Sequence, residues 1–146
     1  MNGVAVAAHP ASAQWNAALL VLRIACALAF LYHGSAVLFG AFGGPGPVAF
    51  AAHIHVPLAV GYLVGLAQLA GGLAILTGVF IRLGAACVII VMIGAISLVH
   101  LPHGFDVSHG GMEYALTLLL VAFALMLTGP GGYSLAGILP EPLRKL

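Results

Sequence analysis

The sequence predicts an all-α fold, an integral membrane four-helix bundle, and three observations lead to this prediction. Of the 146 residues, 63% are hydrophobic and only 5% are charged, whereas a soluble domain carries about 25% charged residues. The stretches without a formal charge are long enough for helices of about 20 apolar residues, the length a bilayer requires. Clusters of glycine and proline separate these stretches and punctuate them as loops.

The charge-free stretches define four spans within a single membrane domain over 1–146. The stretch between Arg23 and Arg82 holds two spans, because the Gly/Pro-rich outer loop 40–57 divides it. The turn at Ile81-Arg82 is so short that the second and third spans must be antiparallel neighbours. A Gly-Pro-Gly-Gly run closes the last span, and a tail covers 133–146. The predicted spans are about 17–38, 58–80, 83–101 and 112–128.

Two of these spans carry polar residues whose placement can be predicted. Arg23 lies near the start of the first span, where its long side chain could snorkel to the lipid headgroups. In the second span Gly61, Gly65, Gln68 and Gly72 are spaced by four, three and four residues, so they share one helix face. Small residues at such spacing allow helices to approach closely. Gln68 is therefore expected on a packed face.

The positions of the basic residues predict the orientation. Cytoplasmic loops carry an excess of Lys and Arg. Four spans place Arg23, Arg82, Arg144 and Lys145 on one side. We therefore expect a multi-pass protein of the inner (plasma) membrane with both termini in the cytoplasm. A net charge of +1 gives no electrostatic reason to expect nucleic acid as a partner.

This orientation gathers the other polar residues at the outward-facing end. Six of the seven histidines and two of the three carboxylates converge there, although only Lys and Arg were used to orient the chain. Ionisable groups within a bilayer are costly and usually face the interior of the bundle. We predict a ligand or proton pocket whose floor is Gln68, formed by His33, Gln68, His100 and Glu113.

Three functions fit such a pocket. Imidazole can pass protons near neutral pH and can hydrogen-bond a quinone carbonyl. Neutral histidines with a carboxylate can instead hold a transition metal, and the candidate ligands are His33, His53, His55, His100, His103 and Glu113. The third reading is structural, a hydrogen-bond network that ties three helices together in a non-catalytic scaffold for partner subunits.

Short motifs along the chain resemble the DoxX family of small membrane proteins. Leu22-Arg23 is followed by Phe30-Leu-Tyr-His-Gly34, and the first loop contains Gly43-Gly-Pro-Gly46. The ordered set continues with Ala67–Gly72, Thr77–Arg82, His100, Gly104-Phe105, Glu113–Leu116 and Gly129–Leu135. The resemblance covers about 22–135, nearly the whole chain.

The resemblance implies a four-helix membrane protein associated with redox enzymes. Relatives include a subunit of a thiosulfate:quinone oxidoreductase and partners of membrane oxidoreductase complexes. Two departures stand out: Gln68 occupies a position where family members usually carry Glu, and His53-Ile54-His55 is unusually rich in histidine. We therefore expect a quinone-linked membrane subunit, at most one subunit of an oxidoreductase, with a protein partner or as a homo-oligomer.

Overall fold

The computed structural model describes residues 10–145, and all regular structure within them is helical. This confirms the predicted all-α membrane fold. The five α-helices are α1 (Pro10–Phe39), α2 (Gly46–His53), α3 (Leu58–Thr77), α4 (Ile81–Ala95) and α5 (Glu113–Thr128). A π-helical turn, Ile96–His100, continues α4. The remaining helical elements of the described chain are short 3₁₀ turns: Ala41–Gly43, Leu101–His103, Val107–His109, Leu135–Ile138 and Glu141–Lys145.

Three helical segments are long and apolar enough to cross a bilayer. They are Ser12–Phe39, Leu58–Thr77 and Ile81–His103. The fourth apolar helix, α5, has 16 residues and is about 24 Å long at 1.5 Å per residue. It is therefore somewhat shorter than a hydrocarbon core of about 30 Å.

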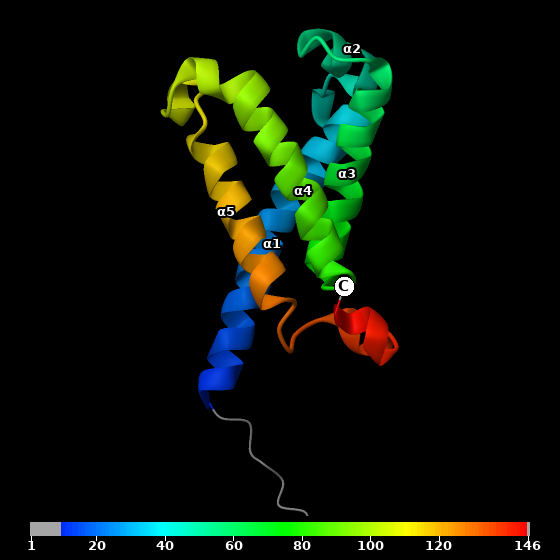
Figure 1. Ribbon diagram of the computed structural model, residues 1–146, viewed down its shortest axis with the longest axis vertical. Coiled ribbons are helices and arrows are strands. Elements are labelled where there is room, and N and C mark those ends of the chain that lie inside the picture. The colour runs from blue at the N-terminus through cyan, green and yellow to red at the C-terminus, as the bar shows by residue number, and fades with distance from the viewer. Residues whose placement is uncertain (1–9, 146) are drawn as a thin grey trace, which may run out of the picture.

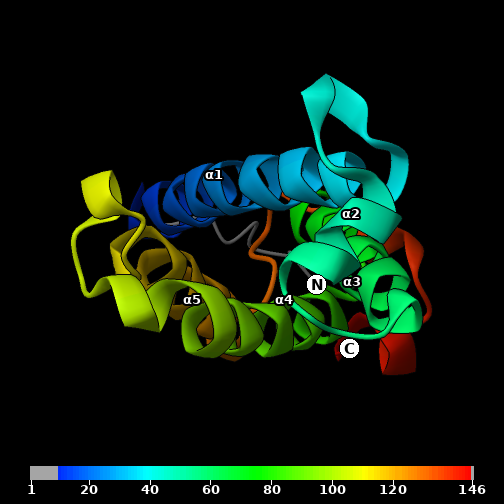
Figure 2. The ribbon, with the colours of Figure 1, turned by 90° about the horizontal axis from the view of Figure 1, so that it is seen from above.

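The helices form two arms that separate toward one end of the molecule. One arm consists of α1, α2 and α3, and the other of α4 and α5 (Figure 1). Seen from above, α1 runs along one side and α4 with α5 along the other, while α2 lies beside α3 (Figure 2). We call the end that carries α2 and the 101–112 segment the open end, and the end where α4 begins the closed end.

The first arm is held together by direct backbone contact between α1 and α3. A Cβ added to Gly34 would lie 2.6 Å from the backbone nitrogen of Leu69, and one added to Gly65 would lie 2.7 Å from Leu38 Cγ. The glycine stripe predicted in the second span is buried, as is Gln68. These observations confirm that this face of α3 is packed, and the packing fixes Gln68 against α1.

The boundaries of the helices follow from local chemistry. Helix α3 ends at Thr77 because Gly78 adopts a left-handed conformation at φ 78°, which glycine tolerates best. Helix α1 begins at Pro10, seven residues before the span predicted from 17. At the other end of α4 the π-helical turn precedes Pro102. Since proline cannot donate the next backbone hydrogen bond, the regular α-helical ladder does not continue there.

The core lies where the arms meet, near the closed end. Cys26, Phe30, Ile75, Val88 and Leu125 are among its fully buried side chains. They come from α1, α3, α4 and α5, so this cluster joins both arms. The open end has no comparable core among the described residues, and the arms separate there.

Arg23 corrects one prediction made from the sequence. Its side chain does not snorkel, because it is 1% exposed. Its Nε donates to the carbonyl of Ile75 at 2.8 Å, and Nη2 donates to that of Leu76. Nη1 donates to the carbonyls of Pro130 and Tyr133 at 2.9 and 2.7 Å. The guanidinium thus caps the end of α3 and holds the segment that follows α5.

Candidate functional site

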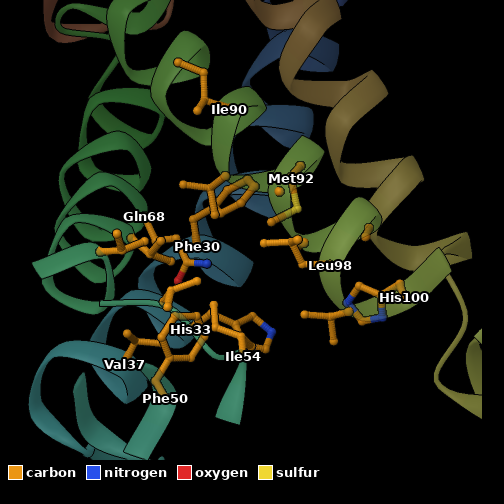
Figure 3. Close-up of a pocket in the computed structure, with 18 of the residues that line it drawn as sticks. Phe30, His33, Val37, Phe50, Ile54, Gln68, Ile90, Met92, Leu98 and His100 are labelled. Atoms are coloured by element: carbon orange, nitrogen blue, oxygen red, sulfur yellow. The ribbon is translucent and has the colours of Figure 1, made fainter. Parts of the chain in front are cut away.

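A cavity of about 350 Å³ lies between the two arms at the open end. Helix α1, helix α3 and the segment around α2 form one side of it, and α4, its π-helical turn and α5 form the other. Most of the lining is apolar. Figure 3 shows the labelled side chains approaching the cavity from both arms, with Phe30, His33 and Gln68 opposite Met92, Leu98 and His100.

Gln68 lies deepest among the polar lining residues. It is 7% exposed, and within the described chain its Oε1 atom has no hydrogen-bond partner. A buried amide oxygen without a partner loses its hydration without compensation, which costs about 1–3 kcal/mol. The contact of α1 with α3 brings Gln68 Cβ close to Gly34. Gln68 thus places an amide with an unsatisfied acceptor oxygen in the wall of the cavity.

His33 faces the same cavity from α1 and is oriented by aromatic neighbours. Its ring meets Tyr32 edge-on, with ring centroids 5.3 Å apart. Tyr32 in turn stacks on Phe42 of the first loop at 5.0 Å. The His33 side chain lines the cavity and is nevertheless exposed, because the cavity is open at this end. The imidazole is thus accessible to a molecule inside the cavity.

His100 reaches the cavity from the second arm, on the π-helical turn. Its Nδ1 lies 2.8 Å from the carbonyl oxygen of Gly110. A carbonyl only accepts, so Nδ1 carries the proton and donates it. In the neutral ring Nε2 is then a free acceptor, and in the protonated ring it is a second donor. π-Helical turns like the one that carries His100 occur frequently at functional sites.

Glu113 differs from the other three predicted pocket residues because it does not line the cavity. Its Oε2 accepts a hydrogen bond from the backbone N–H of Val107 at 3.3 Å. Its own backbone N–H donates to the carbonyl of Phe105. Glu113 therefore supports the connection between α4 and α5. The structure brings together His33, Gln68 and His100, and leaves Glu113 outside the cavity.

The remaining predicted metal ligands are distributed around the open end. His53 lines the cavity at the end of α2, whereas His55 and His103 do not. His103 Nδ1 donates to the carbonyl of Val99 at 2.8 Å. Among residues 10–145, no three or more His, Cys, Asp or Glu side chains gather closely enough to hold a metal ion. The geometry therefore gives no support to a metal centre.

Sequence reasoning missed the residues that shape the apolar part of the cavity. Phe50 and Ile54, in and after α2, cover one side, and Gly94 of α4 leaves space on the other. An isolated glycine within an apolar run was the available signal for Gly94. Phe50 and Ile54 carried no distinctive signal, because apolar residues are abundant throughout this chain.

The arrangement is suited to a mostly apolar molecule with a few polar atoms. Ligand sites are commonly cavities of 300–1,000 Å³ with predominantly apolar walls and a small number of placed polar groups. Here the polar side-chain groups are the amide of Gln68, the imidazoles of His33, His53 and His100, and the phenol of Tyr114. They can donate and accept hydrogen bonds.

The chain is similar to known proteins of one family. A family model described as DoxX matches residues 18–101. The chain is 30% identical over 110 residues to a Bacillus subtilis (strain 168) protein named "Putative oxidoreductase CatD", covering 75% of this chain and 78% of that protein. No solved structure matches the chain significantly.

Proposed function

Since this chain belongs to the DoxX family of membrane proteins, we propose that it binds a membrane quinone in the cavity between its arms. In this proposal the chain is a subunit that works with an electron-donating oxidoreductase. It supplies hydrogen bonds and protons to the quinone, and the partner supplies electrons. The similarity to a protein named as an oxidoreductase supports the association with redox chemistry.

The unpartnered Oε1 of Gln68 is the observation that carries this proposal. A quinone can accept hydrogen bonds at its two carbonyl oxygens, and a quinol can donate from its two hydroxyl groups. The amide of Gln68 serves both forms, because its nitrogen donates and its oxygen accepts. A carboxylate at this position would only accept when ionised. The amide therefore fits a ligand that alternates between acceptor and donor.

The histidines account for the protons. A quinone, when bound, supplies two-electron chemistry, since its reduction to the quinol takes up two electrons and two protons. His33 and His100 face the cavity from opposite arms, so each can deliver a proton to a nearby quinone oxygen. The hydrogen bond from His100 Nδ1 to Gly110 directs Nε2, the atom left to exchange protons, away from the backbone.

The distribution of charge supports an outward-facing site. Arg23 lies beside the last residues of α3, and Arg82 is in the first turn of α4, so both are at the closed end. The positive-inside rule assigns that end to the cytoplasm. The cavity then opens toward the outer face of the inner membrane, where the histidines exchange protons with the outside medium.

Quinone binding can be tested directly with the purified chain in lipid nanodiscs. Menadiol, the reduced form of a naphthoquinone without a tail, has hydroxyl groups that can donate to Gln68 Oε1. It is titrated under anaerobic conditions and its binding is measured by equilibrium dialysis. We expect Gln68→Leu to weaken binding about tenfold, the effect of about 1.4 kcal/mol. His103→Leu is the matched polar-to-apolar control outside the cavity and should bind as the wild type does. Failure of the wild type to bind would leave a ligand-free scaffold as the better description.

A further inference from the structure

The cavity-facing side of α4 has a gap in its row of side chains. Ile90, Gly94 and Leu98 follow each other at intervals of four residues, so they lie along one helix face, and all three line the cavity. Ile90 and Leu98 are 71% and 61% exposed. Apart from the nearby backbone of its own helix, a Cβ built on Gly94 would meet no atom of the described residues within 4 Å. Gly94 therefore forms a notch between two large exposed side chains.

Close helix packing does not explain this glycine. Gly71 of α3 shows the usual explanation, because a Cβ there would lie 2.7 Å from Val88 Cγ1. Gly84 of α4 is similar, since its Cβ would lie 2.6 Å from that of Ala74. A glycine inside a helix costs about 1 kcal/mol relative to alanine. At Gly94 this destabilisation is not offset by a close helix contact. The missing side chain leaves open space beside the cavity.

The notch lies where α3 and α4 have separated. The two helices are in contact near their connecting turn, at Gly71 and Gly84, and they diverge toward the open end (Figure 1). Val60 and Val64 line the cavity on the α3 side of this opening. Figure 3 shows Gln68 on α3 and Leu98 on α4 on opposite sides of the cavity. The walls of the opening are thus apolar.

Polarity changes along the path from the cavity to this opening. Gln68 is buried at the inner end, whereas exposed aliphatic side chains form the rim. In a bilayer, the opening between two spanning helices faces lipid chains rather than water. A molecule that fits this gradient has a polar ring at one end and a long aliphatic chain at the other.

We propose that Gly94 forms a lateral portal between α3 and α4, through which the isoprenoid tail of a lipid quinone leaves the cavity. This inference rests on the proposed quinone function and specifies it further: the ligand is a long-tailed quinone that enters from the bilayer. Ile90 and Leu98 lie one turn before and one turn after the tail, and Gly94 provides the width for it to pass.

A pair of quinones that share one ring tests the portal. Menadione has no tail, and menaquinone-4 carries four isoprene units on the same naphthoquinone. We expect Gly94→Leu in nanodiscs to weaken binding of menaquinone-4 at least tenfold, because the new side chain fills the notch. Binding of menadione should change less than threefold. Ala70→Leu adds the same bulk to an exposed position of α3 outside the cavity and should leave both affinities unchanged.

The outcomes separate the portal from the function on which it rests. If Gly94→Leu lost affinity equally for both quinones, or for neither, the portal would be overturned. The proposed quinone-binding function would still stand, because the wild-type protein would bind both. Failure of wild-type protein to bind either quinone would overturn the proposed function and the portal with it. Gly94→Val provides a smaller obstruction if the leucine variant is poorly produced, and it should show the same selectivity with a weaker effect.

Discussion

The two ends of this molecule treat their buried polar groups in opposite ways. At the closed end, Arg23 donates hydrogen bonds to four backbone carbonyls from two separate segments. At the open end, Gln68 is almost as deeply buried, yet its Oε1 has no hydrogen-bond partner among residues 10–145. Both residues lie in an apolar chain where unsatisfied polar groups are costly.

This difference distinguishes a structural polar residue from one that is available to a ligand. Arg23 is positively charged and lies at the C-terminal end of α3, where the helix dipole is negative. Its hydrogen bonds join α1, α3 and the segment after α5, so its role is complete within the chain. Gln68 adds no such connection through Oε1, and the cavity beside it leaves room for an external partner.

The largest expected effect of a substitution is at the closed end. Arg23→Met would remove all four donors and leave the carbonyls of Ile75, Leu76, Pro130 and Tyr133 without them. Each unsatisfied buried group costs about 1–3 kcal/mol, so we expect a loss of at least about 3 kcal/mol in the free energy of unfolding. Thermal unfolding in detergent measures this. Val21→Ala, at an exposed position of α1, should unfold nearly as the wild type does. Unchanged stability of Arg23→Met would show that the network is not structural.

The next comparison is between a glycine packed between helices, Gly71 of α3, and a glycine beside the cavity, Gly94 of α4. Gly71→Ala would place a Cβ 2.7 Å from Val88 Cγ1 and 3.0 Å from the carbonyl oxygen of Gly84, and such overpacking costs about 1–3 kcal/mol. Gly94→Ala adds the same atom where nothing lies within 4 Å. It should stabilise the helix by about 1 kcal/mol. Shifts of the same sign in thermal unfolding would contradict the distinction between packed glycine and open notch.

Gln68→Leu should change the free energy of unfolding less than Arg23→Met does, and any change should be in the opposite direction. The substitution removes a buried amide whose oxygen has no partner, so the free energy of unfolding should be unchanged or rise by about 1 kcal/mol. The same variant should lose quinone affinity. A strongly destabilised Gln68→Leu protein would place this residue with Arg23, as part of the structural framework.

Much of this fold could be predicted because lipid imposes strong constraints on sequence. The absence of charge from Arg23 to Arg82 and the Gly/Pro loop near 40–47 indicated helices and their connections. The glycine spacing in α3 indicated its packed face, because one period of the helix relates those residues. These signals are local, and they depend on a few neighbouring residues.

The candidate site was harder to predict because it depends on the directions of separate helices. His33, Gln68 and His100 come from three helical segments, and their shared cavity follows from the divergence of the arms. Glu113 is the first residue of α5 at the same end of the molecule, yet its carboxylate accepts a hydrogen bond from the Val107 backbone. Arg23 was misassigned because a charged residue near a span end can reach either headgroups or the exposed carbonyls of a neighbouring helix.

The smallest expected effect concerns the connection between α4 and α5 at the open end. The backbone N–H and hydroxyl of Ser108, and then His109, donate hydrogen bonds to Asp106 and lower the pKa of its carboxyl group. Since the pKa is lower in the folded chain, this turn is stabilised at pH values above the ordinary pKa of aspartate, about 3.9. The stabilisation is lost as the pH falls through the lowered folded value. Hydrogen-exchange protection of the Ser108 amide should therefore be constant near neutral pH and decline in acid.

Asp106→Asn tests whether this decline belongs to the carboxylate. Asparagine can accept the same backbone hydrogen bond but does not titrate, so protection of Ser108 should be retained in acid as well as at neutral pH. Asp106→Ala removes the acceptor and should lower protection at every pH. Because the carboxyl group is exposed and lies outside the cavity, quinone binding should change little in either variant. An acid-dependent decline that persists in Asp106→Asn would show that the Asp106 carboxylate is not its cause.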